Sequence, residues 1–229
     1  MARIVVITGA NRGLGRGIAE AFHARGDVVV GLNRTLCGEN WLREIPCDLR
    51  DSEAIRKAVA VAAGDLGGID VVVSNAGIRR FGPVDEISPE DWEESLTVNL
   101  RAPFYLTQAV APHLIQAKGL LVYVGSHAGL HPFEGGAAYC VTKAALHALA
   151  EVALFDLRHR DVRVVTLAPG AIANRPLPDD EWKIRPRDIG ELLVGLADLP
   201  ASMVPTQVKI SPSRPKKLPF RGIDVLQYM

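Results

Sequence analysis

The sequence predicts an α/β fold in which helices cover a doubly wound parallel sheet of about seven strands. Short β-branched runs end at glycine or small polar residues, as buried parallel strands do. Helical patterns alternate with these runs along the chain. A chain of 229 residues can bury a full core, and its length fits one domain or at most two.

The first strand, residues 3–8, leads through a glycine-rich turn at 8–15 into a helical pattern around 18–22. Glycine lets the backbone turn tightly, and a helix N-terminus offers free N–H groups and a positive dipole end to a pyrophosphate. A tight turn without a ligand is the alternative. The strand before the turn and the helix after it favour a dinucleotide site.

The residues after the second strand, 28–32, bear on the choice of dinucleotide. A site for unphosphorylated NAD usually has an acid there, which accepts hydrogen bonds from the ribose 2′-hydroxyl. This chain has Asn33 and Arg34 instead, and Asp27 lies at the wrong end of the strand. Arg34 and Arg12 are cations suited to a 2′-phosphate. Two solvated arginines are the alternative. Arg12 and Arg34 nevertheless stand at both places where the 2′-phosphate would lie, and this coincidence favours NADP.

The later elements continue the alternation. A third strand at 44–49 follows the second after only about ten residues, too few for a full crossover helix. A helix that starts at Ser88 contains Pro103, which removes a backbone hydrogen bond one turn earlier, near Asn99. The other predicted strands are 69–73, 120–124, 162–167 and 208–210, and the other predicted helices are 52–63, 137–158 and 187–197.

Tyr139 and Lys143 lie four residues apart in the helix predicted at 137–158, so they share one face. We expect the Lys143 ammonium to lower the pKa of the Tyr139 phenol, ordinarily about 10. An ordinary helix-surface pair is the alternative. The helix is apolar on nearly every side, which predicts burial on more than one face, against the sheet and against a partner subunit.

The composition argues against several classes of protein. Lys+Arg and Asp+Glu both number 26, so no bulk charge favours nucleic acid or an anionic membrane. No apolar run approaches the roughly 18 residues of a membrane span, and the first apolar run is too short for a signal peptide. The three cysteines show no CxxC spacing, which indicates reduced thiols, no metal site and a cytoplasmic location.

Taken together, the motifs resemble those of the short-chain dehydrogenase/reductase family, in its compact single-domain branch. The resemblance covers roughly residues 3–210. It implies a Rossmann-like, NADP-binding catalytic domain at 1–210 and a proline-containing, solvated tail at 211–229. Six motifs carry it, in the family's order: Thr8-Gly9-x-x-x-Gly13-x-Gly15, Asn75-Ala76-Gly77, Asn99, Ser126, Tyr139-x-x-x-Lys143 and Pro169-Gly170.

The resemblance implies a catalytic set of four residues. Tyr139 would protonate the carbonyl oxygen during reduction and act as the base in the reverse direction. Lys143 would hold the nicotinamide ribose and keep the tyrosine pKa low. Ser126 would hydrogen-bond the substrate oxygen. Asn99 would anchor a water that links Lys143 to solvent.

The resemblance also implies where the cofactor binds, from the glycine turn to the ends of the later strands. Where the family often has Thr, Asn174 stands and can make similar bonds, and a short substrate lid would span 171–186. The predicted cofactor-binding residues are Gly9, Asn11, Arg12, Gly13, Leu14, Gly15, Asn33, Arg34, Asp48, Leu49, Asn75, Ala76, Gly77, Tyr139, Lys143, Pro169, Gly170 and Ile172.

The resulting prediction is an oxidoreductase that transfers a hydride between NADP(H) and a carbonyl or secondary alcohol, assembled as a homodimer or homotetramer. A non-catalytic, NADP-sensing regulatory or scaffold protein on the same fold is the alternative. The substrate stays open among a 3-oxoacyl thioester, a sugar, a steroid-like ring and a small ketone. Arg79 and Arg80 could face a substrate carboxylate, although solvation of both is the favoured interpretation.

Overall fold

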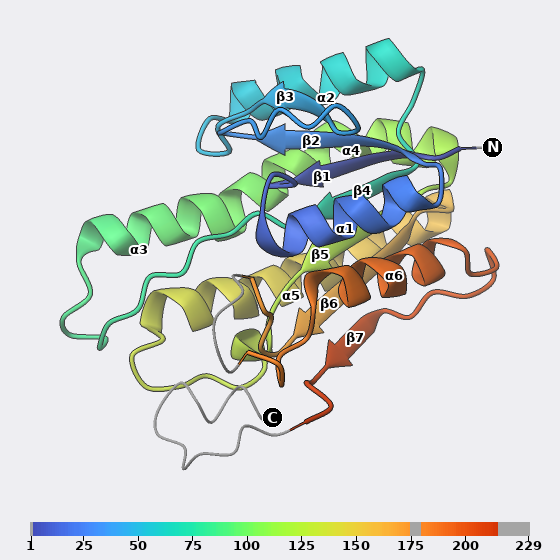
Figure 1. Ribbon diagram of the computed structural model, residues 1–229. Coiled ribbons are helices and arrows are strands. Elements are labelled where there is room, and N and C mark those ends of the chain that lie inside the picture. Colours follow the sequence, from blue (N-terminus) through green and yellow to red (C-terminus); the bar gives the residue numbers. More distant parts are fainter. Residues whose placement is uncertain (1, 175–179, 215–229) are drawn as a thin grey trace.

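Figure 1 shows the protein as a computed structural model, which describes residues 2–174 and 180–214. These residues form one seven-stranded parallel sheet, as predicted, with the order β3-β2-β1-β4-β5-β6-β7. The strands are β1 (Ile4–Thr8), β2 (Val28–Asn33), β3 (Arg43–Pro46), β4 (Val71–Ser74), β5 (Leu120–Val124), β6 (Arg163–Pro169) and β7 (Gln207–Ile210). The α-helices are α1 (Gly13–Ala24), α2 (Ser52–Leu66), α3 (Pro89–Leu96), α4 (Ala102–Ala117), α5 (Ala137–Leu157) and α6 (Pro186–Ala197).

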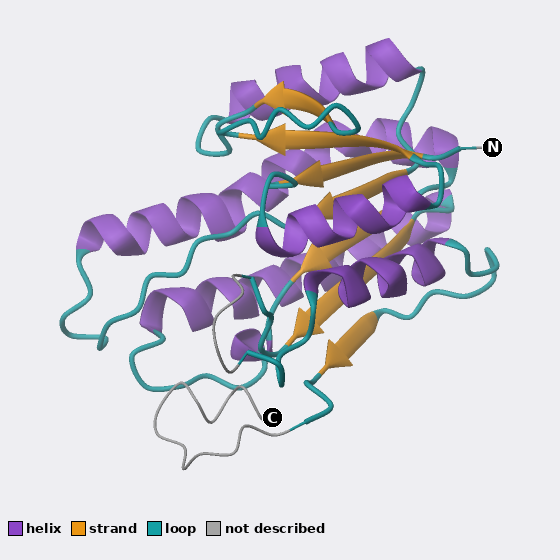
Figure 2. Ribbon diagram, viewed as in Figure 1, coloured by secondary structure: helices purple, strands orange, loops and turns teal. Residues whose placement is uncertain are grey.

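The strand order reverses between β1 and β4. The chain first builds outward through β2 and β3, then returns to place β4 on the other side of β1. At such a switch point the connections leave in opposite directions, and open α/β sheets bind ligands in the crevice that results. The arrowheads in Figure 2 mark the carboxyl ends of the strands, where open α/β sheets have this crevice.

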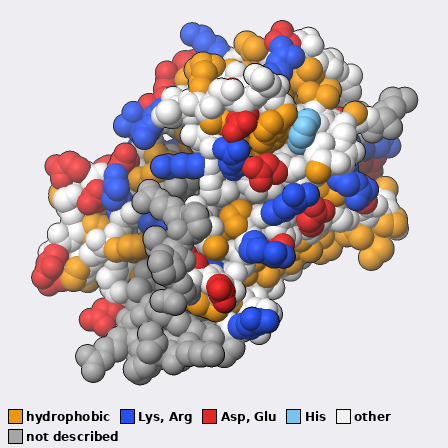
Figure 3. Space-filling view, in the orientation of Figure 1, with side chains coloured by type: hydrophobic (Ala, Val, Ile, Leu, Met, Phe, Trp, Pro, Cys, Tyr) orange, Lys and Arg blue, Asp and Glu red, His pale blue; other side chains and the backbone are white. Residues whose placement is uncertain are grey.

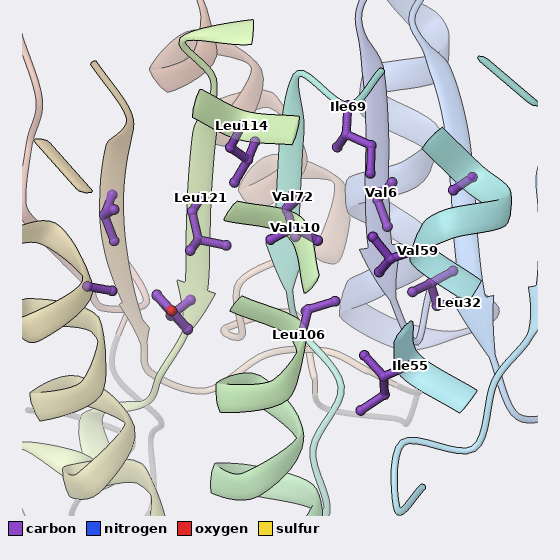
Figure 4. Close-up of a cluster of buried hydrophobic side chains, with 14 of the residues drawn as sticks. Val6, Leu32, Ile55, Val59, Ile69, Val72, Leu106, Val110, Leu114 and Leu121 are labelled. Carbon is purple, nitrogen blue, oxygen red and sulfur yellow. The ribbon is translucent and has the colours of Figure 1, made fainter. Parts of the chain in front are cut away.

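Two hydrophobic cores lie on opposite faces of the sheet, because successive strand residues point to opposite sides. On one face, Val6 and Val72 of the strands pack with Val59 of α2 and Val110 of α4 (Figure 4). The neighbouring strand positions, such as Val5, face α1 and α6 instead. Layers of helices therefore cover both faces and leave the strand ends free for a site.

Helices α1 and α6 pack closely because of two glycines. A Cβ atom on Gly190 would lie 2.6 Å from the Ala21 Cβ and from the Gly17 carbonyl oxygen. A Cβ atom on Gly17 would lie 2.5 Å from Pro186. Both distances are too short for real Cβ contacts, so these positions set how near the two helices approach.

The predicted elements are found with small shifts at their ends. β3 ends at Pro46, so Asp48 and Leu49 lie in the turn after the strand and not within it. β6 continues to Pro169, two residues beyond the predicted end. The segment between β2 and β3 contains no helix, as its length predicts.

The long helix that begins after Ser88 is divided by an irregular turn. The Ser88 hydroxyl oxygen accepts a hydrogen bond from the Asp91 N–H (3.1 Å) and caps α3. Between α3 and α4, residues Thr97–Arg101 form a π-helical turn. Pro103 has no N–H to offer the Asn99 carbonyl, so the change in hydrogen bonding falls where the sequence predicted it.

Helix α5 is buried on one side only within the single chain. Val141, Val152 and Phe155 on its outer side are 48%, 54% and 51% exposed. The second buried face expected from the sequence is therefore open in the monomer, and contact with a partner subunit stays a prediction. The apolar sequence pattern alone cannot show which side of α5 is buried, because alanine also occurs on exposed surfaces.

By length and composition, Ala137–Arg160 is apolar enough to cross a membrane, the one such helix among the residues described. This differs from the expectation that no run approaches that length. A core helix of a soluble protein passes the same test, and 44% of the tested window is buried. The finding is weak evidence for a span.

Charged side chains of both signs are interspersed over the face in Figure 3. Arg16, for example, forms ion pairs with Glu20 and Glu39. Exposed pairs of this kind add little to stability. Such mixing does not create the patch of one sign that nucleic acid requires on that face.

Candidate active site

The glycine turn brings the N-terminus of α1 to the crevice. Gly9 and Gly13 have φ of +69° and +54°, a region that favours glycine. A Cβ atom on Gly15 would lie 2.1 Å from the Gly9 carbonyl oxygen. The Leu14 N–H donates to the Asn174 side-chain oxygen (2.9 Å). An oxygen is therefore held at the helix N-terminus, where a pyrophosphate oxygen binds in folds of this type.

Thr8 fixes the ends of β1 and β4 relative to each other. Its hydroxyl oxygen accepts hydrogen bonds from the N–H groups of Asn75 and Ala76, both at 3.0 Å. The Asn75 side chain donates in return to the Thr8 carbonyl (2.9 Å). A Cβ atom on Gly77 would lie 3.1 Å from the Asn99 side-chain oxygen. The predicted Asn-Ala-Gly segment thus joins the switch point to the π-helical turn.

The loop after β2 lies beside the glycine turn. The Asn11 side chain donates to the Thr35 carbonyl (2.9 Å), which links the two segments. Arg12 and Arg34, predicted to bind a 2′-phosphate, are both exposed on these linked segments.

Asp48 and Leu49 follow β3 at the same edge of the sheet. Hydrogen bonds from Arg50 lower the pKa of Asp48, and the Arg34 charge lowers it further. The Asp48 carboxylate is therefore ionised near Arg34. Leu49 is half-buried and packs against the core.

Glu44 of β3 is an acid in this region that the sequence analysis missed. It accepts hydrogen bonds from the Asn33 side chain (2.7 Å) and the backbone N–H groups of Cys37 (3.0 Å) and Gly38 (2.8 Å). Burial opposes ionisation of Glu44, but these bonds lower its pKa overall. The register of β2 and β3 sets this contact, so no local sequence signal marks it.

Asn33 has one polar atom without a partner. Its side chain is buried, and its Oδ1 atom has no hydrogen-bond partner among the described residues. Buried polar atoms are rarely left unpaired, and an exception calls for a bound molecule or another explanation. A hydroxyl or amine of a ligand at the end of β2 would satisfy this oxygen.

Asn99, in the π-helical turn, holds the chain beyond the Asn-Ala-Gly segment. Its side-chain oxygen accepts from the Ile78 N–H (2.8 Å), and its side-chain nitrogen donates to the Ile78 carbonyl (3.0 Å) and to the Thr142 hydroxyl (3.1 Å). Thr142, which the sequence analysis missed, thus joins α5 to this turn. The water expected at Asn99 stays a prediction.

Lys143 points from α5 into the protein. It is 4% exposed, and its ammonium donates to the Val124 carbonyl at the end of β5 (2.8 Å). Burial lowers its pKa to about 8.

Tyr139 is half-buried at the start of α5, and its hydroxyl lies in the neighbourhood of the Ser126 side chain. Burial raises the pKa of Tyr139, whereas the Ser126 side chain and the Arg79 charge oppose this rise. The expected lowering of this pKa by Lys143 is not found. The physical reason is burial, which opposes both the phenolate and the lysine's own charge.

His147, which was likewise not predicted from the sequence, contacts the backbone of Ser126. Its Nε2 atom accepts a hydrogen bond from the Ser126 N–H (3.3 Å), and the Ser126 hydroxyl oxygen accepts from the Ala128 N–H (3.1 Å). Burial and the Lys143 charge lower the pKa of His147 to about 4. The imidazole is therefore neutral near pH 7 and can accept this bond.

The segment after β6 lies at the same end of the sheet as the residues described above. The Gly170 N–H donates to the Ile210 carbonyl (2.8 Å), which joins the end of β6 to β7. Ile172 forms an isolated bridge with Ile184. Residues 175–179 of the expected lid and 215–229 of the expected tail lie outside the described residues.

Comparison with known proteins decides the family. The sequence profile of the short chain dehydrogenase family matches residues 3–180. The chain belongs to this family. An uncharacterised oxidoreductase of Staphylococcus aureus strain MW2 is 26% identical over 224 residues, 92% of this chain and 97% of that protein. A D-threitol dehydrogenase of Mycolicibacterium smegmatis is 29% identical over 182 residues, 74% of this chain and 70% of that one.

Solved structures agree with this assignment. An alcohol dehydrogenase of the archaeon Thermococcus sibiricus, complexed with 5-hydroxy-NADP, has a TM-score of 0.86 at 25% identity, over 96% of this chain and 100% of that one. A metagenomic short-chain oxidoreductase in complex with NADP has a TM-score of 0.82 at 32% identity, over 93% and 98%. The chain is therefore an oxidoreductase of the short-chain dehydrogenase family, whose fold binds a nicotinamide cofactor.

The residues present fit such a cofactor. The Leu14 N–H, in the glycine turn, donates a hydrogen bond to an oxygen. The Asn33 side-chain oxygen has no hydrogen-bond partner among the described residues. Tyr139 and Lys143 lie at the same strand edge, in the first two turns of α5. A nicotinamide bound along this edge would supply or accept a hydride.

Proposed function

We propose that the chain is an NADP(H)-dependent carbonyl reductase or alcohol dehydrogenase, with Tyr139 as its general acid and base. The observation that carries this proposal is the grouping of Tyr139 with Ser126, whose side chain lowers the Tyr139 pKa against burial, and with the Lys143 ammonium, 5.9 Å from the centre of the tyrosine ring. A proton donor, a second hydroxyl and a cation in one crevice match the needs of carbonyl reduction.

A nicotinamide bound here would supply the hydride for the carbonyl carbon, and Tyr139 would give the carbonyl oxygen its proton, so that a ketone would become a secondary alcohol. Ser126 would orient the carbonyl oxygen by a hydrogen bond. Lys143 would hold the nicotinamide ribose and restore the proton of Tyr139. Asn99 fixes the chain at Ile78 and supports a water that connects Lys143 to solvent.

We assign NADP over NAD because Arg12 and Arg34 are exposed on two linked segments beside the end of β2. Guanidinium groups bind phosphate through paired hydrogen bonds. The two solved relatives described above, which are complexed with NADP or 5-hydroxy-NADP, support this assignment by likeness. The other proposed cofactor contacts are those predicted from the sequence.

The exposed apolar side of α5 supports a homodimer or homotetramer, as proposed from the sequence. We also propose a cytoplasmic protein whose catalytic domain ends near residue 210. The sensor alternative gains no support, because a protein that only binds the nucleotide has no need of a general acid and base such as Tyr139.

A screen of NADPH oxidation across carbonyl classes tests the function, with the Tyr139→Phe variant as the blank. We expect turnover in at least one class that the blank lacks. Tight NADPH binding without turnover in any class would favour the sensor alternative.

A further inference from the structure

Two loops meet beside Tyr139. One follows β4 and the other precedes α5. The Gly82 N–H donates to the Gly135 carbonyl (2.8 Å), and Gly82 also forms an isolated parallel bridge with Gly136. Backbone contacts thus hold the two loops together beside Tyr139.

Phe81 joins this pair of loops to the proposed proton donor. Its ring centre lies 5.6 Å from that of Tyr139 with an interplanar angle of 79°, and 5.7 Å from that of Phe133 at 60°. These are edge contacts, a preferred arrangement of aromatic rings. Phe81 is nevertheless 46% exposed. A large apolar ring therefore faces solvent directly beside Tyr139.

The open space at these rings is a groove of about 320 Å³, lined by Phe81, Gly82, Phe133, Glu134 and Gly135. Its volume lies in the range of small-molecule sites. Among the described residues, no atom lies within 4 Å of a Cβ atom built on Gly135. The groove is thus lined by two aromatic rings, two glycines and Glu134, and the small glycines leave room for a flat group.

We propose that this groove holds an aromatic ring attached to the carbonyl carbon, so that the substrates are aryl ketones and the corresponding secondary alcohols. The proposal rests on the proposed function, because it places the carbonyl at Tyr139. An aryl ring can stack against Phe81 and Phe133 while the carbonyl oxygen meets Tyr139 and Ser126. The two phenyl rings themselves offer no hydrogen-bond partner to the hydroxyl groups of a polyhydroxylated chain.

The test compares acetophenone with 2-butanone as substrates for NADPH oxidation. We expect the ratio of kcat/KM values to favour acetophenone in the wild-type protein and to fall about tenfold in Phe81→Ala and Phe133→Ala. Phe81→Leu keeps apolar bulk on the exposed loop, and it takes the place of an alanine variant that proves unstable in this comparison. Val84→Ala, three residues along the same loop and outside the groove lining, is the control and should leave the ratio unchanged.

A binding measurement separates this inference from the proposed function. Saturation-transfer NMR with 1-phenylethanol and 2-butanol reports groove binding without turnover. Binding of the aryl alcohol that weakens in Phe81→Ala supports the groove even if no ketone is reduced, in which case only the proposed function fails. Turnover with no aryl preference, or a preference that both phenylalanine variants retain, overturns the inference.

Discussion

The Lys143 ammonium lies 5.9 Å from the centre of the Tyr139 ring and donates a 2.8 Å hydrogen bond to the Val124 carbonyl. Burial lowers the pKa of Lys143 to about 8 and raises that of Tyr139. The two values move in opposite directions because burial disfavours the charged form of each group. Titratable neighbours with shifted pKa values are typical of sites that move protons.

Replacing Lys143 with methionine should stabilise the fold near pH 7. The pKa of Lys143 falls from 10.5 to about 8 on folding, so keeping it charged below pH 8 costs up to about 3 kcal/mol. We expect the free energy of unfolding of Lys143→Met, from urea titration, to exceed that of the wild type by about 1–3 kcal/mol.

The gain should shrink as pH rises from 8 toward 10.5, because the unfolded wild-type chain then binds more protons than the folded one and wild-type stability increases. The exposed Lys57→Met is the control and should show no such change with pH. A Lys143→Met variant that is less stable at pH 7 would contradict the cost assigned to this buried charge.

Arg79 and Arg80 should differ in their effect on the pH dependence of alcohol oxidation. The Arg79 charge lowers the pKa of Tyr139, whereas Arg80 is paired with Asp91 and Glu94. Oxidation requires the phenolate as base, so its rate rises with pH through the Tyr139 pKa.

Arg79→Ala should therefore move the rising limb of the kcat/KM profile to higher pH, and Arg80→Ala should leave it in place. Equal shifts in the two variants would show that Arg79 has no specific effect on Tyr139.

Much of the fold follows from the sequence because strand patterns and glycine turns are local signals. The doubly wound sheet, the break in helix hydrogen bonding near Asn99 and the Tyr139/Lys143 spacing all come from such signals. Contacts that side chains make between different elements do not follow from local signals. Thr142 and His147 reach the site only through the packing of α5, and Glu44 only through the register of β3.

The glycine contacts between α6 and α1 likewise do not follow from local sequence signals. Two substitutions within α6 test them. Gly190→Ala should lower the free energy of unfolding by about 1–3 kcal/mol, because its Cβ would overlap Ala21 and the Gly17 backbone of α1. Gly195→Ala on the same helix meets nothing within 4 Å and should stabilise by up to about 1 kcal/mol. Urea titrations measure both, and two changes of the same sign would refute the packing account.

Arg34→Asp tests the choice of cofactor. Removing a phosphate contact and adding an acid should weaken NADPH binding about tenfold to a hundredfold while affecting NADH far less. Fluorescence titration of both nucleotides measures the ratio of Kd values. Arg160→Asp, in the short 3₁₀ turn Arg158–Arg160 that follows α5, controls for net charge. An unchanged ratio in Arg34→Asp would remove the basis for assigning NADP.

The central claim is that Tyr139 transfers the proton, and Tyr139→Phe tests it most directly. The change removes one hydroxyl and keeps the ring that contacts Phe81. With a carbonyl substrate from the screen, we expect kcat to fall by about 10²- to 10⁴-fold while the Kd for NADPH stays nearly unchanged. Turnover at the wild-type rate by Tyr139→Phe would contradict the claim.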